Sequence, residues 1–149
     1  MSIIKMRPPR IAAGLTLAAA IVHWYANGSA SMRFSSHWAG TFLGLTGFTL
    51  MMWAWLLFKR QNLAVCLPDR TAHITQTGPY RFTRNPMYLG MVLIMLGLAL
   101  FIGTAPFYFS AIIYFGILNF CFCPFEEKKL SAAFGGEYSR YRRKVRRWL

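Results

Sequence analysis

Two short polar clusters have the residue types to bind a charged small molecule. Arg84 stands just ahead of one apolar run, and Glu126 and Glu127 directly follow another. A guanidinium group binds carboxylates or phosphates, and a carboxylate accepts hydrogen bonds from hydroxyl or ammonium groups. We therefore predict one site for a ligand that carries both kinds of group. The alternatives are that the arginine contacts only lipid phosphates, and that the carboxylates only pair with basic neighbours on a helix surface.

The residues around Arg84 have the pattern of a helix start. Asn85 is a preferred N-cap residue, and Pro86 suits the first helical position because its missing N–H is not needed there. Arg81 and Arg84 then lie just before a helix N-terminus, whose unpaired N–H groups and dipole also favour an anion. The pattern therefore predicts an anion site at this point of the chain.

Four apolar runs must position these residues. A helix that crosses the bilayer core needs about 20 residues, and backbone groups in hydrocarbon must be paired within the helix. We predict an all-α integral membrane bundle, a single domain over residues 1–149. Its helices are expected at about 11–26, 38–58, 86–102 and 105–125, with a basic amphipathic tail at 126–149.

The third and fourth runs form a predicted helical hairpin. Only Gly103 and Thr104 separate them, and so short a link forces two antiparallel helices. The hairpin returns Glu126 to the membrane face at which Asn85 begins the third helix. This shared level favours a binding site over surface pairing.

Composition and charge distribution support a membrane location. The chain is 56% hydrophobic and 14% charged, whereas soluble domains carry about 25% charged residues. All basic residues except Arg33 lie before the first run, between the second and third, or after the fourth. The positive-inside rule then predicts a multi-pass protein with both termini cytoplasmic. We expect the membrane to be a bacterial inner membrane. The basic blocks flank apolar runs, which favours anionic lipid headgroups as partners and argues against nucleic acid.

Other features narrow the classes further. Three cysteines without a repeated framework argue against a disulfide scaffold, and the histidines have no metal-like partners nearby, so we predict no metal site. Gly40 and Gly44 form a small-residue face that permits close helix packing and leaves a homo-oligomer open. The first run is predicted to be retained, with a cleaved signal peptide as the alternative.

The motifs together identify a family. Thr77 to Arg81, then Arg84-Asn85-Pro86 with Tyr88 and Gly90, and finally Glu126-Glu127 with the segment up to Trp148, resemble the isoprenylcysteine carboxyl methyltransferase and phospholipid methyltransferase superfamily. The resemblance covers the second half of the chain. Many members carry Arg-His-Pro where this chain has Arg-Asn-Pro, which weakens inference about the substrate more than inference about the cofactor.

The resemblance implies methyl transfer from S-adenosylmethionine at the cytoplasmic face, to a lipophilic acceptor that enters from the bilayer. It implies catalytic roles for Arg84, Asn85 and Tyr88. The cofactor-binding residues that it implies are Gly78, Pro79, Tyr80, Arg81, Asn85, Tyr88, Gly90, Glu126 and Glu127. A carboxylate, a thiol and a lipid amine all stay open as acceptors, and only an amine must first lose a proton to a base.

Three other functions fit parts of the sequence. Sterol reductases, which use NADPH, share the C-terminal pattern but are usually much longer. Small multidrug transporters have four helices, but they carry a carboxylate in the first one, where this chain has only His23 as an ionisable group. The third alternative is a methyltransferase relic that binds a partner without activity.

Overall fold

The computed structural model describes residues 8–26, 35–65 and 76–149. Within these ranges the chain is helical and contains no strand. Arg33 and residues 66–75, which carried part of the charge argument, lie outside the described residues. The all-α class predicted from the sequence is therefore confirmed for the part of the chain that the structure describes.

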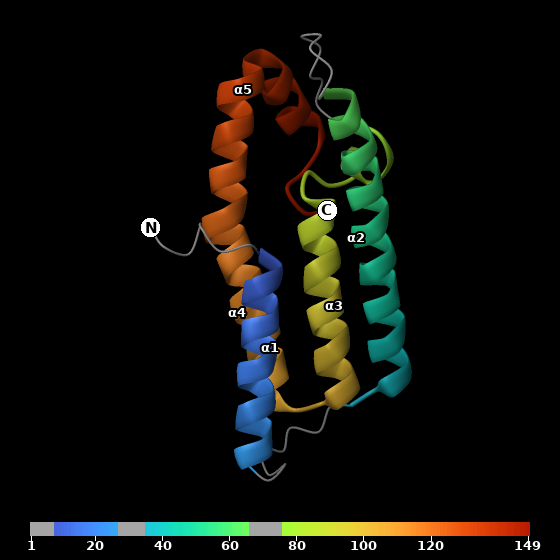
Figure 1. Cartoon of the computed structure of the whole chain (residues 1–149), viewed down its shortest axis with the longest axis vertical. Helices are drawn as coiled ribbons and strands as arrows, with labels where there is room; N and C mark the ends of the chain where they lie inside the picture. Colours follow the sequence, from blue (N-terminus) through green and yellow to red (C-terminus); the bar gives the residue numbers. More distant parts are fainter. Residues whose placement is uncertain (1–7, 27–34, 66–75) are drawn as a thin grey trace.

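The helices form two antiparallel pairs, and the two pairs pack against each other (Figure 1). Helix α1 (Pro8–Tyr25) packs mainly against α4 (Ala105–Ile117), and α2 (His37–Val65) packs against α3 (Pro86–Ile102). Helix α3 begins and ends where the sequence predicted. Helix α2 continues to Val65, beyond the predicted end at residue 58, because no proline or glycine interrupts it there.

Glycines bring α2 and α3 into backbone contact. A Cβ atom on Gly97 would lie 2.6 Å from the backbone nitrogen of Gly44 and 2.7 Å from the carbonyl oxygen of Gly40. Farther along the same contact, a Cβ atom on Gly90 would lie 2.6 Å from the carbonyl oxygen of Gly47. In lipid, where apolar surface gains little from burial between helices, such close packing is a main source of helix association.

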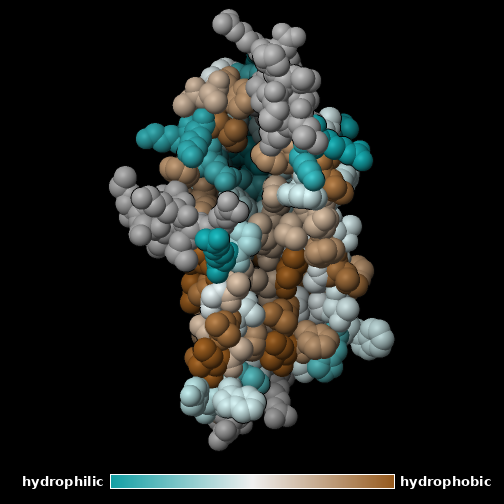
Figure 2. Space-filling view, in the orientation of Figure 1, coloured by the Kyte–Doolittle hydropathy of each residue, from teal (hydrophilic) through white to brown (hydrophobic). Residues whose placement is uncertain are grey.

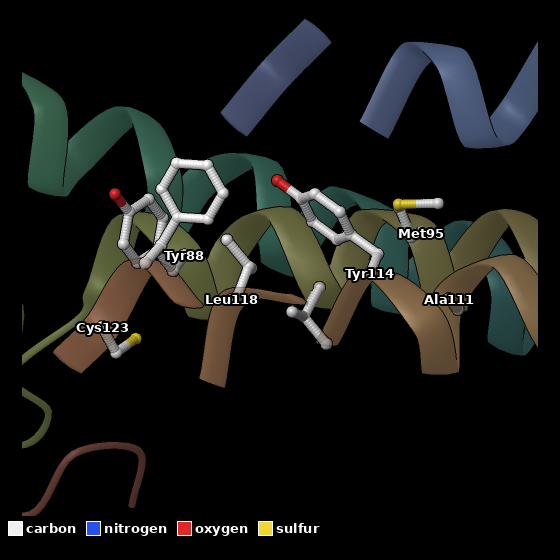
Figure 3. Packing of buried hydrophobic residues seen from close by; sticks show 8 residues of the cluster. Tyr88, Met95, Ala111, Tyr114, Leu118 and Cys123 are labelled. Carbon is white, nitrogen blue, oxygen red and sulfur yellow. The ribbon is translucent and has the colours of Figure 1, made fainter. Parts of the chain in front are cut away.

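Helices α3 and α4 enclose the main core (Figure 3). Tyr88 and Met95 of α3 meet Ala111, Tyr114 and Leu118, all of them buried. The Tyr114 hydroxyl is directed toward α1, where it donates a hydrogen bond to the carbonyl oxygen of Pro8 at 3.3 Å. This core fixes α1, α3 and α4 relative to one another and so supports the start of α3.

A tight link joins α3 to α4, as the sequence predicted. Gly103 ends α3 with a φ of 77°, and its N–H donates to the carbonyl oxygen of Ala99 at 2.7 Å. Only glycine adopts this left-handed conformation without strain. The link turns the chain back so that α4 runs antiparallel to α3.

The helical structure that begins at Ala105 continues past residue 125, where the sequence predicted the end of the last membrane helix. Helix α4 continues through a π-helical turn, η3 (Leu118–Phe122), into α5 (Cys123–Lys144). The predicted tail is therefore helical and continuous with the membrane helix. Pro124, which has no N–H to donate, lies at the start of α5 directly after the π-helical turn. At Gly135, with a φ of 49°, the helix bends back toward the start of α3.

Two of the described helices are long and apolar enough to cross a membrane, His37–Arg60 within α2 and the continuous helix Ala105–Lys144. Helix α3 is apolar but shorter. Figure 2 shows hydrophobic residues over the middle of the molecule and hydrophilic residues gathered toward the end where α5 lies. A bundle of four spans stays a prediction.

Candidate functional site

A short 3-10 helix, η2 (Gly78–Arg81), leads the chain toward α3 and packs on α2. The Tyr80 hydroxyl donates to the carbonyl oxygen of Ala54 in α2 at 3.4 Å, and the carbonyl oxygen of Tyr80 accepts a hydrogen bond from Tyr141 at 2.7 Å. Burial and, to a smaller extent, the negative charge of Glu126 raise the pKa of Tyr80 to about 12. Its hydroxyl therefore stays protonated at neutral pH and available as a donor.

The start of α3 is held by the segment that follows α5. Asn85 occupies the N-cap position, but its side chain does not cap the helix. Its amide donates instead to the carbonyl oxygen of Arg147 at 3.3 Å, and the Thr83 hydroxyl donates to the same oxygen at 2.9 Å. The backbone N–H of Arg84 donates to the carbonyl oxygen of Arg146 at 3.0 Å. The part of the predicted family motif around Arg84 is therefore hydrogen-bonded directly to the last part of the motif, around Arg147.

The adjacent carboxylates Glu126 and Glu127 have different environments. Glu126 is exposed and accepts a short hydrogen bond from the hydroxyl of Tyr88. Glu127 is only 7% exposed. Neighbouring residues on a helix point in directions about 100° apart. The first turn of α5 therefore directs Glu126 toward one site and Glu127 toward another.

Glu127 is the centre of an ion cluster, defined here as Arg84, Glu127 and Arg147. Arg147 binds both carboxylate oxygens, Nε to Oε1 and Nη2 to Oε2, each at 2.8 Å. Arg84 Nη1 lies 3.1 Å from Oε1 and donates to the hydroxyl of Tyr138 at 3.3 Å. The hydrogen bonds to Glu127 raise the pKa of Arg147, against the opposing effect of its partial burial, so the cluster holds two cations and one anion.

Arg147 is anchored in turn by the π-helical turn. Its Nη1 donates to both the backbone and the side-chain oxygens of Asn119 at 3.3 Å, and the indole N–H of Trp148 donates to the same side-chain oxygen at 3.0 Å. The Trp148 ring packs on Phe115, with centroids 5.0 Å apart. Sequence reasoning missed Asn119 as a site residue, although an amide inside an apolar run was a signal that could have drawn attention to it.

A cavity of about 400 Å³, the polar cavity, opens between α2, the start of α3 and the start of α5. Five of the predicted site residues line it: Tyr80, Arg84, Asn85, Tyr88 and Glu126. Lys129 adds a cation, and the apolar part consists of Phe58, Pro86, Met87 and Leu130. The volume is within the range of about 300–1,000 Å³ that is usual for small-molecule sites.

The other predicted site residues lie elsewhere. Gly78 packs against Leu57 of α2, Gly90 lies in the α2–α3 contact, and Arg81 is exposed. Pro79 is buried in η2, and Glu127 belongs to the ion cluster. The structure thus brings half of the predicted residues to the cavity wall and places the other half outside it, and their predicted contact with a cofactor stays a prediction.

One buried polar atom at the cavity has no partner within the described part of the chain. The Arg84 side chain is 9% exposed, and its Nε–H makes no hydrogen bond. An unpaired buried donor costs about 1–3 kcal/mol, more when it is charged. Arg84 also lines the polar cavity, so the wall of the cavity includes a cation that is not fully paired.

Comparison with known proteins places these features in a family. The model of a family described as phospholipid methyltransferase matches residues 35–137. Over 63 residues the chain is 41% identical to an uncharacterized protein of Haemophilus influenzae, a stretch that covers 42% of this chain and 100% of that protein. No solved structure matches the chain.

Proposed function

The chain belongs to the phospholipid methyltransferase family, and from this premise we propose that it transfers a methyl group from S-adenosylmethionine to a lipophilic acceptor in the membrane. The observation that carries the proposal is the polar cavity, where the cation Arg84 and the carboxylate residue Glu126 line one space. The family sets the reaction class, and these two groups indicate how the site would hold the methyl donor.

The residues of the cavity fit the chemical groups of S-adenosylmethionine. The methionine part of this cofactor carries a carboxylate and an ammonium group, and its ribose carries two hydroxyls. Arg84 has a donor for the carboxylate, and Glu126 is an acceptor for ribose hydroxyls or the ammonium group. The N-terminal turn of α3, with Pro86 and Met87 in the cavity wall, adds a positive dipole end that favours the carboxylate.

The chemistry that the chain must supply is mainly positioning. The bound cofactor supplies a methyl group already activated on a sulfonium sulfur. Holding two reacting groups in line can contribute about 7–11 kcal/mol to a reaction barrier. Tyr88 is buried in the main core and bonded to Glu126, so the core of α3 and α4 fixes the orientation of the carboxylate. Should the acceptor be an amine, Glu126 is the carboxylate in reach to take its proton.

The apolar part of the cavity supports a lipophilic acceptor. Phe58 of α2 and Leu130 of α5 are both exposed and both line the cavity. These helices are parts of the two longest apolar helices of the molecule. An acceptor with a hydrocarbon chain could therefore approach between them from the bilayer while its polar end reaches Tyr88 and Glu126.

The distribution of basic residues supports a cytoplasmic location for the cavity. Lys59 and Arg60 at the end of α2 and the basic residues of α5 lie at the same end of the bundle as the cavity. Basic residues concentrate on the cytoplasmic side of membrane proteins and also attract anionic lipid headgroups. The cofactor would then enter from the cytoplasm.

Replacing Glu126 by glutamine is expected to weaken binding of S-adenosylmethionine about tenfold, because a charged acceptor becomes neutral. Glutamine retains an oxygen for the Tyr88 hydroxyl, so the packing of α3 against α5 is preserved. Titration calorimetry on the detergent-purified protein measures this, with Glu137→Gln as the matched control, since Glu137 does not line the cavity.

NADPH is titrated in parallel. Saturable binding of S-adenosylmethionine without binding of NADPH is the expected result for the wild-type protein. Binding of NADPH alone would move the assignment to a reductase. Binding of neither by a folded sample would contradict the methyltransferase proposal altogether.

A further inference from the structure

The ion cluster contains an arginine that the proposed cofactor site does not use directly. Arg147 does not line the polar cavity, yet it makes the strongest interaction of Glu127, a bidentate pair with both distances at 2.8 Å. Arg84, which does line the cavity, contacts Oε1 of the same carboxylate at the longer distance of 3.1 Å. The buried carboxylate is thus shared unequally between two cations.

This unequal sharing affects how far the positive charge of Arg84 is neutralised by Glu127. If Arg147 were absent, Glu127 would have both oxygens free for Arg84, and the two would form a neutral one-to-one pair. Guanidinium and carboxylate groups favour this bidentate arrangement. With Arg147 in place, the cluster keeps one excess positive charge, and the Nε–H of Arg84 stays without a partner. A buried cation of this kind attracts an anion strongly because solvent screens it little.

The position of Arg147 is fixed from two sides. Its side chain is held by Asn119 of the π-helical turn, and its carbonyl oxygen accepts hydrogen bonds from Thr83 and Asn85. The π turn is a local departure from the regular helix, a feature that is frequent at functional sites. The fold therefore positions Arg147 for its ion pair with Glu127, because other hydrogen bonds hold both its side chain and its backbone.

We propose that Arg147 is a positioning residue, which holds Glu127 in a bidentate ion pair and thereby leaves Arg84 free to bind the carboxylate of the methyl donor. The inference rests on the proposed function and adds to it the group of the cofactor that Arg84 recognises. It predicts a preference of the protein for S-adenosylmethionine over its decarboxylated form, which retains the sulfonium and the ammonium group.

The test compares the binding of these two ligands by calorimetry. Wild-type protein is expected to bind S-adenosylmethionine at least tenfold more tightly than decarboxylated S-adenosylmethionine. In Arg147→Met, Glu127 pairs fully with Arg84, and the preference is expected to fall to within about twofold. Arg147→Lys, which keeps the charge but loses the fork geometry, is expected to retain an intermediate preference.

A double variant separates positioning from a merely structural role. In Glu127→Gln/Arg147→Met no carboxylate competes for Arg84, so the preference for the carboxylated ligand is expected to return. If Arg147 only supports the fold, the double variant will bind both ligands as poorly as the single one, which overturns the inference. Thermal unfolding of each variant accompanies the titrations.

The possible failures are distinguishable. A wild-type protein that binds both ligands equally well contradicts the role of Arg84 and Arg147 but leaves the methyltransferase proposal standing. An unchanged preference in Arg147→Met likewise overturns the positioning role alone. A wild-type protein that binds neither ligand overturns the proposed function, and this inference with it.

Discussion

Replacing Arg84 by methionine is expected to weaken binding of S-adenosylmethionine about a hundredfold. The Arg84 side chain is almost fully buried at the wall of the polar cavity and carries an unpaired donor. Charge-assisted hydrogen bonds contribute about 1.5–3 kcal/mol each, and the upper part of this range corresponds to a factor of about one hundred. Methionine has a similar length, so the loss is one of charge and donors more than of volume.

The variant should still fold. Glu127 keeps its bidentate partner Arg147, so no buried carboxylate is left without a cation. The backbone hydrogen bond from residue 84 to the carbonyl oxygen of Arg146 does not depend on the side chain. We therefore expect thermal unfolding of the purified variant to shift far less than its affinity, with calorimetry and unfolding measured on the same preparation.

Arg81→Met is the matched control. Arg81 precedes the same helix by a few residues but is exposed and does not line the cavity. Its replacement is expected to change the affinity less than threefold, as is usual for exposed charges. Equal losses in the two variants would show that the arginines act only through the general positive field of this end of the protein.

The parts of the site that sequence analysis predicted are those that depend on local signals. Asn85 and Pro86 identified the start of α3, and Gly103 identified the tight link to α4. Once the hairpin was inferred, its geometry required the chain after α4 to return to the level of Arg84. The ion pair between Arg84 and Glu127 follows from that return.

The different locations of Glu126 and Glu127 could not be predicted from the sequence. Their directions depend on the phase of α5, and the π-helical turn before it changes that phase relative to a regular helix. Sequence reasoning therefore treated the two carboxylates as one unit. The structure places one on the polar cavity and one in the ion cluster.

The role of Arg147 was hidden for a related reason. As a continuation of the helical pattern, Arg147 belongs to the basic amphipathic tail, for which anionic lipid headgroups were the predicted partners. The helix ends before it, however, at Val145, which has extended backbone angles of φ −121° and ψ 130°. Helical spacing no longer applies beyond that residue, and the following segment passes instead between the start of α3 and Asn119. Only tertiary structure shows this change of direction.

Replacing Gly97 by alanine is expected to destabilise the protein by about 3 kcal/mol, the upper end of the usual cost of overpacking. The added Cβ atom would overlap the backbone of α2 at Gly40 and Gly44, and a backbone cannot move aside as a flexible side chain can. Separation of α2 from α3 would also withdraw Phe58 from the polar cavity. A lower thermal unfolding temperature, together with weaker binding of S-adenosylmethionine, is therefore expected.

Gly44→Ala on the facing helix is the control, and its expected effect on stability has the opposite sign. A Cβ atom on Gly44 would meet nothing within 4 Å, so the substitution adds no overlap. It removes the conformational freedom of a helical glycine, which is worth up to about 1 kcal/mol in favour of alanine. The unfolding temperature should thus rise slightly with Gly44→Ala and fall clearly with Gly97→Ala. Because both changes add the same methyl group to the same helix pair, only the close backbone contact accounts for opposite signs, and equal shifts would contradict it.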